Sequence, residues 1–471
     1  MLNSFRRVAR LILFGCIAIS GISASLPKEI VKMVEQNKID PRNLSIYITD
    51  TKRGRIIASH REGMYRTPAS VVKLLTTYAA LIDLGAGFRW PTRFYYTGTF
   101  SKGTINGNLI VKPYGDPTLS YKHIVSIVKQ LKRFGIKRIT GDMIIDRSFF
   151  AVGDRINSGF DKNSYSEYNA MPDAMMVDDH LCKFIIDPRK GSASVWKTIP
   201  DESYKIINYL KITDKACSGK YSWPRINVNR SGDSTRVTIS GTISKRCPPR
   251  RVEKVLSHPY KTFYYILKHE MNSSGIEFKG ELKLRGTPQN ARTIMTYYST
   301  PLINIISKTN KKSNNLYARH IFLLLGAKHF GPPATEKKGR KAVKKILGKR
   351  KIIGTGTILD NGCGLSRHSR LTALTLHRLL QDAYRHYGKK WMRTLSIAGR
   401  DGTTRKRFLK SVARNRAWMK TGTLKNAKNI AGYVKGRSGR LYTVIILYNG
   451  QKKWQGAQLQ NQIIEWIVRN K

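Results

Sequence analysis

The sequence has few cysteines and no cluster of metal-binding side chains. Only five of the 471 residues are cysteines, and no two of them lie close together or beside a group of histidines. Because metal-ligating residues recur at short spacings, no metal site is expected. Four cysteines follow the first 24 residues, and they allow three pairings. Cys217 with Cys247 is the favoured pair, since the two flank a hairpin-rich stretch.

Long hydrophobic runs are also missing. The apolar run Leu11 to Ile22 is shorter than the ~20 residues of a comfortable membrane span. It follows Arg6, Arg7 and Arg10 and precedes the small residues around Ala24, an order typical of a secretory signal. Residues 1–24 are therefore expected to be a signal peptide, with an uncleaved N-terminal anchor as the alternative. The mature chain is expected to be exported, either to the periplasm or to the outer face of the cytoplasmic membrane.

Acidic residues are scarce, with 29 Asp and Glu against 86 Lys and Arg and a formal net charge of +57. In a cytosolic protein this excess would suggest nucleic-acid binding. For an exported chain the available polyanions are membrane surfaces, lipopolysaccharide and cell-wall polymers. The basic residues are spread along the whole chain, so a solvated surface is the simpler interpretation and contact with membrane or wall polyanions the alternative. No nucleic-acid partner is expected.

Patterned segments at both ends indicate one folded domain. The alternation in Leu44 to Ile48 and in Ile56 to Ala58 predicts a strand hairpin, and an apolar run from Ser70 to Leu84 predicts a helix. After Thr300 further helices are expected, and strands return near the end. The helical segments are Leu302 to Ile306, Leu316 to Leu325, Leu371 to Tyr387 and Ile463 to Val468, and the strands are Ile430 to Tyr433 and Tyr442 to Leu447.

The middle of the chain has a different texture. Short strand patterns alternate with turn-rich stretches, and one helix is expected near Ile124 to Phe134. The sequence thus predicts an α/β (α+β) domain made of residues 25–90 and 290–471. A β-rich insertion of one or two subdomains, residues 91–289, splits this domain.

A serine and a lysine three residues apart open the predicted helix at Ser70. The spacing places Lys73 one turn beyond Ser70 on the same face, and burial could turn such a lysine into a general base for the serine. The Ser-x-x-Lys pattern occurs three more times, at Ser25, Ser126 and Ser194, but only Ser70 has a chain break before it and an apolar helix after it. Alone, the pattern is also that of a helix-capping serine followed by a surface lysine.

Two further patterns follow in order. Ser313-Asn314-Asn315 is the only Ser-x-Asn in the chain and lies between two predicted helices. Lys420-Thr421-Gly422-Thr423 contains the only Lys-Thr-Gly and comes just before the last pair of strands. These three elements in this order occur in penicillin-binding proteins and related β-lactamases.

On these motifs the whole mature chain resembles the class C low-molecular-mass penicillin-binding proteins, which are D-alanyl-D-alanine carboxypeptidases and endopeptidases. The segments Asp360 to His368 and Ala398 to Arg407 strengthen the resemblance, although Cys363 stands where serine is expected. The resemblance implies a serine transpeptidase/β-lactamase-like fold. It also implies peptidoglycan stem peptides as substrates, β-lactams as covalent inhibitors, and a reaction that needs no cofactor or metal.

The same resemblance implies a role for each motif residue. Ser70 would attack the carbonyl between two D-alanines, and Lys73 would take its proton. Ser313 would pass a proton to the departing amine, and Asn315 would hold the peptide and Lys73. Lys420 and Thr421 would bind the free carboxylate of the terminal D-alanine, and Gly422 would let the strand approach the substrate closely. The backbone N–H groups of Ser70 and Thr423 would form the oxyanion hole.

Three alternatives remain at this point. A β-lactamase shares the motifs, but the 313 − 73 = 240 residues from Lys73 to Ser313 demand an insertion that compact lactamases lack. A polycationic envelope-binding protein would explain the charge but not the motifs. The balance between carboxypeptidase and endopeptidase is also open. In the family an acidic residue of the insertion is implicated in that choice. The comparable segment here is Asp161 to Asp173, with Asn163 a candidate for the position of that acid.

Overall fold

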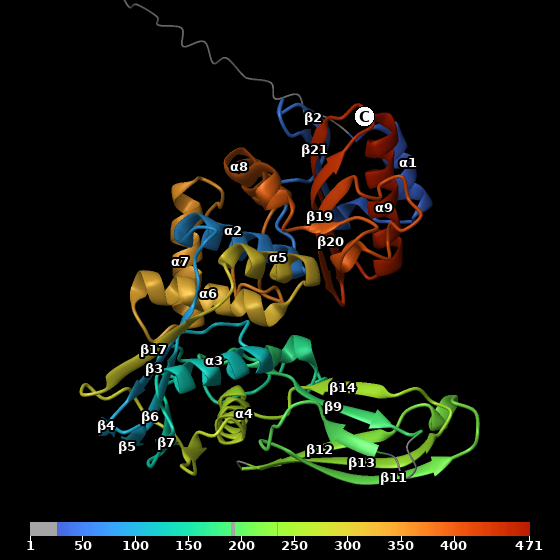
Figure 1. Cartoon of the computed structure of the whole chain (residues 1–471). Helices are drawn as coiled ribbons and strands as arrows, with labels where there is room; N and C mark the ends of the chain where they lie inside the picture. The colour runs from blue at the N-terminus through green and yellow to red at the C-terminus, as the bar shows by residue number, and fades with distance from the viewer. Residues whose placement is uncertain (1–25, 190–193, 233) are drawn as a thin grey trace, which may run out of the picture.

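The computed structural model describes residues 26–189, 194–232 and 234–471. The predicted signal peptide, residues 1–24, lies outside this part of the chain. Figure 1 shows an upper part made from the two ends of the chain and a lower part made from its middle. Among the described helices, none has both the length and the apolar character needed to cross a membrane.

A six-stranded antiparallel sheet forms the centre of the upper part. The two ends of the chain build it together, because β1 pairs along its whole length with β21. The strand order is β18-β19-β20-β21-β1-β2. Their bounds are Leu44–Asp50 (β1), Ile56–His60 (β2), Ser396–Ile397 (β18), Ala417–Leu424 (β19), Ala427–Lys435 (β20) and Leu441–Tyr448 (β21).

Helices cover both faces of this sheet. In β20, Ile430 and Val434 pack into the core shared with α1 (Lys28–Gln36) and α9 (Lys453–Asn470), whereas Ala431 and Tyr433 face the core of the other helices. Successive strand residues point to opposite faces. A strand covered on both sides therefore has a continuous apolar sequence, as β20 and β21 do.

One helix, α2 (Lys73–Leu84), is buried at the centre of the second helical layer. Every residue from Lys73 to Leu81 is buried, as expected for a helix that is apolar on all sides. It is surrounded by α5 (Leu302–Lys312), α6 (Asn315–Phe330), α7 (Glu336–Lys349) and α8 (Ala373–Met392). Ser70 lies in the turn just before the N-terminal end of this buried helix.

The chain leaves the upper part through β3 (Pro91–Tyr96) and returns through β17 (Arg292–Tyr298), and these two strands pair antiparallel. Two small sheets and the helices α3 (Tyr121–Arg133) and α4 (Pro259–Ser273) enclose one core there. The other strands of these sheets are β4 (Thr99–Ser101), β5 (Thr104–Asn106), β6 (Leu109–Pro113), β7 (Arg138–Ile139), β8 (Met143–Ile145), β15 (Glu277–Phe278) and β16 (Leu282–Leu284).

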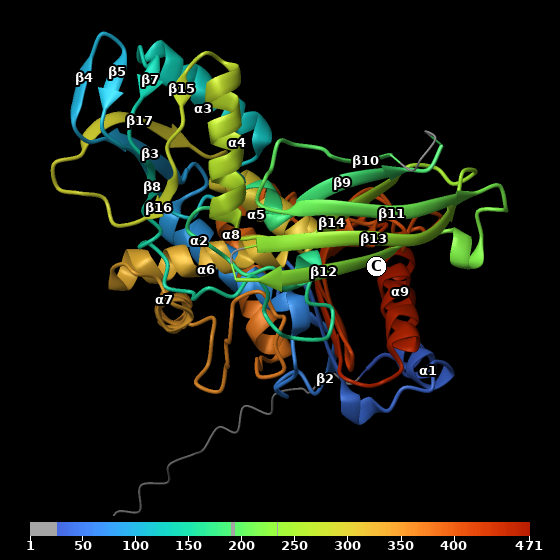
Figure 2. The same ribbon diagram turned by 90° about the horizontal axis from the view of Figure 1, so that it is seen from below.

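A second subdomain is nested inside the first. Two three-stranded sheets enclose its own core, and Figure 2 shows its long strands extending beneath the upper part. The disulfide Cys217–Cys247 closes one end, which confirms the favoured pairing, while Cys182 and Cys363 are free and buried. The strands are β9 (Cys182–Asp187), β10 (Ser194–Lys197), β11 (Lys205–Thr213), β12 (Arg225–Ser231), β13 (Ser234–Ser244) and β14 (Arg250–Lys254).

These sheets and helices confirm the expected fold class, with two subdomains in the insertion. Some expected elements are corrected. Ala69–Val72 form a 3-10 turn, so the helix expected at Ser70 begins at Lys73. The expectation of a single helix in the insertion is wrong, because α4 is a second one. Its aromatic residues are typical of strands, yet Phe263, Leu267 and Met271 follow helical spacing and are buried.

Helices α1 and α7 were not expected either, and α9 begins ten residues earlier than Ile463. In α7 only Ala342, Val343, Ile346 and Leu347 carry the apolar pattern, since lysine and arginine fill most other positions. A narrow apolar stripe of this kind is easily hidden in a basic sequence.

Candidate active site

Ser70 lies in the turn that leads into the buried helix α2. The preceding Ala69 has a φ of +49°, a left-handed conformation that residues with a side chain rarely adopt. Two asparagines of the central sheet fix the chain just before it. The Asn429 Nδ2 donates to the carbonyl oxygens of Thr67 and Pro68, both at 2.9 Å, and the Asn449 Oδ1 accepts from the Thr67 N–H at 2.6 Å.

Lys73 is fully buried beneath Ser70. Its Nζ donates to the Ser70 Oγ at 2.9 Å, to the Asn315 Oδ1 at 2.7 Å and to the carbonyl oxygen of Cys363. Burial lowers the pKa of Lys73 from 10.5 to about 8; the Cys363 thiol raises that pKa and the Arg319 guanidinium lowers it, each by less. A neutral Lys73 amine beside the Ser70 hydroxyl can accept its proton.

A second buried lysine lies beside the second serine. The Lys420 Nζ donates to the Ser313 Oγ at 2.8 Å and to the carbonyl oxygen of Thr421 at 2.6 Å. Burial, and then the charge of Lys73, hold the pKa of Lys420 well below its ordinary value. A bound carboxylate would favour the charged form of Lys420 again, so this amine is suited to recognise an anionic group.

The Ser313–Asn315 motif is held by a helix cap. Ser313 ends α5 in a left-handed conformation with a φ of +58°. The Asn314 side chain accepts from the Tyr317 N–H at 3.0 Å and caps α6. The first N–H groups of a helix have no partner within the helix, and this cap provides an acceptor for one of them. Asn315 then begins α6, and its Nδ2 donates to the carbonyl oxygen of Tyr168 at 2.9 Å. One amide thus joins Lys73 to the insertion.

Two glycines let backbone segments meet at Ser70. A Cβ on Gly422 would lie 2.7 Å from the Pro68 carbonyl oxygen and 2.9 Å from the Ser70 nitrogen. A Cβ on Gly364, which has a φ of +85°, would lie 2.1 Å from the Ala69 carbonyl oxygen. Both positions are therefore closed to larger side chains. The strand β19 reaches the backbone nitrogen of Ser70 only because of Gly422.

A cleft of about 550 Å³ opens above these residues. Ser70, Ser313, Asn315 and Thr423 line its floor side, whereas Lys73 and Lys420 lie fully buried below. The other lining residues are Phe160, Asp161 and Tyr168 of the insertion and Gly364, Leu365, Arg367, Leu424, Lys425 and Lys453 of the upper part. A cleft of this size with a few convergent polar groups suits a peptide-sized ligand.

The insertion carries an acidic side chain into the cleft, and this residue is Asp161. Partial burial raises its pKa, but hydrogen bonds from Asn169, Asn163 and Tyr168 lower it more, so the net pKa lies below the usual value. The Arg367 guanidinium lies over the ring of the neighbouring Phe160 at 4.4 Å and donates to the Phe160 carbonyl oxygen at 3.3 Å. Asn163, the candidate position for the acid, instead donates its amide to the Tyr168 hydroxyl at 2.9 Å.

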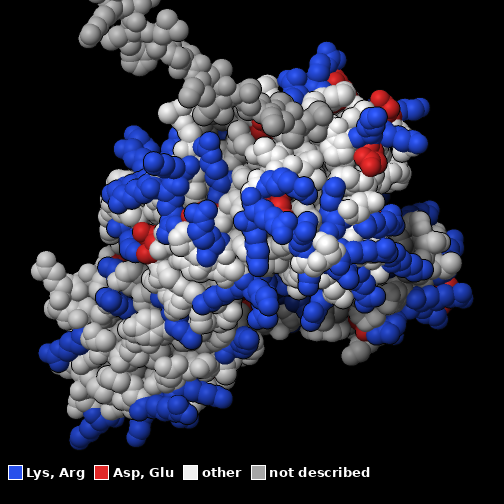
Figure 3. All heavy atoms as spheres, turned by 90° about the horizontal axis from the view of Figure 1, so that it is seen from above, with Lys and Arg blue, Asp and Glu red and all other residues white. Residues whose placement is uncertain are grey.

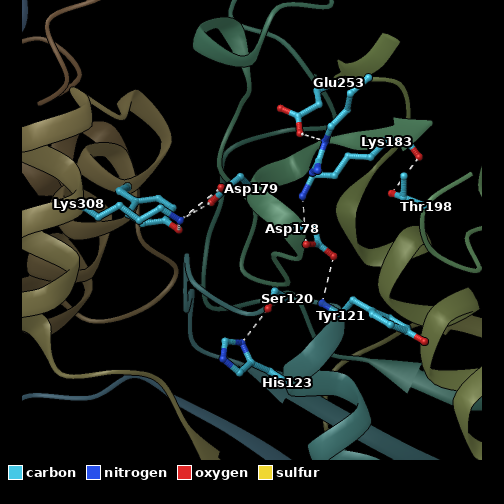
Figure 4. Close-up of polar contacts among 11 residues, drawn as sticks. Ser120, Tyr121, His123, Asp178, Asp179, Lys183, Thr198, Glu253 and Lys308 are labelled. Atoms are coloured by element: carbon cyan, nitrogen blue, oxygen red, sulfur yellow. Dashed lines mark hydrogen bonds and ion pairs between the residues drawn. The ribbon is translucent and has the colours of Figure 1, made fainter. Parts of the chain in front are cut away.

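The insertion also contacts the upper part through a left-handed turn. Asp178, Asp179 and His180 have φ values of +48°, +60° and +62°. Figure 4 shows Asp179 pointing to Lys308 of α5, at 3.4 Å, while Asp178 accepts from the Tyr121 N–H and the Lys183 amine. The Asp179–Lys308 pair holds the insertion against α5, the helix that precedes Ser313.

The structure brings together most of the residues that the sequence singled out. Ser70, Lys73 and Asn315 form one hydrogen-bonded set, Ser313 and Lys420 form another, and both open into the same cleft. The Thr421 hydroxyl donates to that of Thr403 at 2.8 Å, and Thr423 lines the cleft. Among the described residues, no group of three His, Cys, Asp or Glu side chains is suited to hold a metal ion.

Sequence reasoning missed the residues that support the site from other elements. They are Tyr168, Gly364, Thr403, Asn429 and Asn449. Three of them had a usable signal: Gly364 and Thr403 lie in segments that carry the family resemblance, and Asn429 lies opposite Gly422 when β19 and β20 pair as a hairpin. The others depend on contacts between segments far apart in the chain.

Residues 26–470 match the D-Ala-D-Ala carboxypeptidase 3 (S13) family. A D-alanyl-D-alanine carboxypeptidase, DacB, from Haemophilus influenzae is 28% identical over 414 residues, which cover 87% of this chain and 85% of the relative. A D-alanyl-D-alanine carboxypeptidase from Actinomadura sp. strain R39 is 24% identical over 437 residues, 89% of this chain and 80% of the relative.

Solved structures give the same result. The crystal structure of penicillin-binding protein 4 (dacB) from Haemophilus influenzae superposes with a TM-score of 0.78 at 26% identity, over 93% of this chain and 99% of that one. The Bd0816 predatory endopeptidase from Bdellovibrio bacteriovorus shares the fold, with a TM-score of 0.53 at 14% identity over 90% of this chain and 92% of that one.

Proposed function

The chain belongs to the D-Ala-D-Ala carboxypeptidase 3 (S13) family, and we propose from this that it is a serine D,D-peptidase of peptidoglycan with Ser70 as its nucleophile. Two serine–lysine pairs, Ser70 with Lys73 and Ser313 with Lys420, lie at the same cleft, and this observation supports the assignment of the catalytic residues.

In the first half of the reaction the Ser70 Oγ attacks the carbonyl carbon between two D-alanines. The hydroxyl proton passes to the Lys73 amine, which lies 2.9 Å away. Negative charge then develops on the carbonyl oxygen. The backbone N–H groups of Ser70 and Thr423 would stabilise it, a contribution worth about 3–4 kcal/mol per donor in other acyl-transfer enzymes.

In the second half the bond to the terminal D-alanine nitrogen breaks. The Ser313 hydroxyl gives that nitrogen a proton and is reprotonated by the one that Lys73 took from Ser70, relayed through Lys420, to which Ser313 is hydrogen-bonded at 2.8 Å, so Lys73 is neutral and Lys420 charged again. Lys420 and the Thr421 hydroxyl bind the free carboxylate of the departing residue. Water then attacks the acyl-enzyme, releases the shortened peptide and returns the proton to Ser70.

Penicillins would acylate Ser70 through the same steps, because they present a strained amide and a carboxylate. The β-lactamase alternative requires rapid hydrolysis of that adduct. Among the described residues that line the cleft, none is a glutamate that could activate the water. A slowly hydrolysed, inhibitory adduct is therefore the proposal, and a purely polycationic binding protein would leave the two serine–lysine pairs unexplained.

We extend the proposal to D-alanyl cross-links, with Asp161 as the insertion acid that recognises the second stem peptide. Its carboxylate would attract an amino group, and the Arg367 guanidinium, which lies over the adjacent Phe160 ring, would attract a carboxylate. Asp161→Asn should slow cleavage of a cross-linked stem dimer at least about tenfold, the cost of one charge-assisted contact. Trimming of a single pentapeptide should change less than twofold. Equal slowing of both would remove Asp161 from this role.

Export to the periplasm and electrostatic contact with envelope polyanions complete the proposal. Figure 3 shows a face on which lysine and arginine far outnumber acidic residues. Such a surface would favour contact with anionic membrane or wall material outside the cytoplasm. Cell fractionation with mass analysis of the mature N-terminus tests export; full-length chain in the cytosol would contradict it.

The proposed activity is tested by release of D-alanine from a peptide ending in D-alanyl-D-alanine. Ser70→Ala should reduce release at least about 10³-fold, as loss of a nucleophile does elsewhere. The matched control is Ser126→Ala, which removes the serine of another Ser-x-x-Lys pattern, exposed on α3. Unchanged release by Ser70→Ala, or equal loss in both variants, would refute the assignment.

A further inference from the structure

A second cleft, separate from the catalytic one, lies at the other end of strand β19. It has a volume of about 670 Å³ and shares no lining residue with the cleft at Ser70. The ends of β1, β20 and α8 and the start of β21 surround it. Helix α8 is kinked at Gly388, whose φ is +47° and ψ −128°, and its last turn places Lys389 and Arg393 at the rim.

Six positively charged side chains surround this second cleft. Among the described residues, none of these six charged groups has a carboxylate oxygen within 4 Å, whereas other lysines and arginines do form such ion pairs. The one acidic residue in the lining, Asp50, is buried and accepts the backbone N–H groups of Lys52 and Arg53 at 3.0 and 2.9 Å. The six cations are Lys52, Arg53, Lys389, Arg393, Lys435 and Arg440.

The inner wall of the second cleft is aromatic and apolar. Trp418 and Tyr384 are half-buried there and pack against the core around α2 and α8. Rings of this kind offer flat faces to a sugar or another ring. A charged surface that served only to keep protein molecules apart would not need an aromatic wall. Guanidinium groups at the rim match the oxygen geometry of phosphate better than isolated ammonium groups do.

We propose that this second cleft is a binding site for a phosphorylated saccharide, with its ring against Trp418 and Tyr384 and its phosphates among the rim cations. The inference goes beyond the peptidase activity, because the site shares no residue with the catalytic cleft. Trp418 lies two positions before Lys420 on β19, about 7 Å along the strand. A ligand held there would tether the enzyme beside its substrate-binding strand.

The test uses glucose 1,6-bisphosphate as a soluble probe, titrated into the mature protein and followed by calorimetry and tryptophan fluorescence. One saturable site is expected. Arg393→Glu with Arg440→Glu should weaken binding at least tenfold, and Trp418→Phe should abolish the fluorescence change. Glucose, which lacks phosphate, and inorganic phosphate, which lacks a ring, should each bind at least tenfold more weakly.

The matched control reverses two exposed lysines of α7, Lys341→Glu with Lys344→Glu. It changes the net charge by the same amount and should alter binding less than twofold. Penicillin acylation of Ser70 reports folding of every variant and should stay at the wild-type rate in both double variants. Absence of saturable binding, or equal weakening by the control, overturns the site. Equally tight binding of succinate overturns the preference for phosphate.

The source of the saccharide phosphate is separated by vesicles that carry a phosphorylated glycolipid. If the ligand is lipid-borne, the vesicles sediment the wild type, glucose 1,6-bisphosphate releases it, and Arg393→Glu with Arg440→Glu reduces sedimentation. If the soluble probe binds and sedimentation ignores that variant, the ligand is a soluble or polymeric saccharide phosphate. Failure of Ser70 acylation in the wild type would instead refute the peptidase and leave this binding result intact.

Discussion

Two lysines are buried close together at the catalytic centre, and their environments suit different tasks. Lys73 is surrounded by acceptors, namely the Ser70 hydroxyl, the Asn315 amide oxygen and the Cys363 carbonyl. Lys420 donates only to the Ser313 hydroxyl and to one carbonyl oxygen. A bound carboxylate would supply the negative partner that this lysine lacks. The first lysine is therefore suited to exchange a proton and the second to bind an anion.

The rate of D-alanine release should fall on the acid side of pH 8. Burial lowers the pKa of Lys73 to about 8, so at pH 7 only about a tenth of the molecules carry the neutral amine that accepts the Ser70 proton. kcat/KM should therefore be about tenfold lower at pH 7 than on its plateau. Lys420 does not cause this fall, since acid favours its charged, carboxylate-binding form. A pH–rate profile that is flat from pH 6 to 8 would contradict the role of Lys73.

The closeness of β19 to Ser70 should make Gly422 irreplaceable for activity. In Gly422→Ala the new Cβ would press on the Pro68 carbonyl and the Ser70 nitrogen, and displaced donors lose transition-state stabilisation. Acylation by penicillin, measured by stopped-flow, should slow at least about tenfold. Gly63→Ala is the control, because a Cβ there meets nothing within 4 Å. A wild-type rate for Gly422→Ala would show that the close approach is unimportant.

The individual catalytic residues were the part of the site that the sequence predicted best. Ser70, Lys73, Ser313, Asn315 and Lys420 could be named because each belongs to a short local pattern. The residues that hold them could not, since Asn429 and Asn449 reach Thr67 across 362 and 382 positions of sequence. No local spacing encodes such contacts.

Among the helices and strands, the start of α6 both begins a helix and orients catalytic side chains. Its cap, Asn314, lies between Ser313 and Asn315, so the hydrogen bond that begins the helix also sets the direction of both flanking side chains. The helices α5 and α6 were expected because their apolar residues repeat with helical spacing. The lysine-rich α7 and the aromatic α4 were not, because their composition hides that spacing.

Asn314→Ala should therefore affect both stability and catalysis. Loss of a helix cap costs about 1 kcal/mol, which should lower Tm by a few degrees, and penicillin acylation should slow at least about tenfold. Thr335→Ala removes the corresponding cap of α7, where the Thr335 hydroxyl accepts from the Lys338 N–H. That variant should lose similar stability and keep the wild-type acylation rate. Equal acylation rates in the two variants would refute the positioning role of Asn314.

The whole molecule is a split domain with a nested insertion, and only part of this could be predicted. The change near residue 90 to short strand patterns separated by turn-rich stretches indicated an insertion. The nesting could not be inferred, because β3 and β17 pair across 292 − 96 = 196 residues, from Tyr96 to Arg292. The Tyr168 carbonyl of the insertion accepts from Asn315 across 147 positions of sequence, so the insertion completes the catalytic cleft through a long-range contact.

At this scale the surplus of positive charge also has a measurable consequence. With a formal net charge of +57, binding of the Ser70→Ala protein to isolated wall sacculi should weaken steeply as salt rises, because screening shortens the reach of surface charges. Sedimentation at 50 and 500 mM NaCl should differ at least about tenfold in the bound fraction. Binding that does not change with salt would refute electrostatic contact with wall polyanions.

The central claim, that Ser70 forms an acyl-enzyme, is tested most directly by intact mass and peptide mapping after reaction with a fluorescent penicillin. The account predicts one adduct per molecule, located on the peptide that contains Ser70, absent from Ser70→Ala and lasting many minutes. A folded wild type without an adduct, or an adduct that persists in Ser70→Ala, would contradict it. An adduct hydrolysed within seconds would instead identify a β-lactamase.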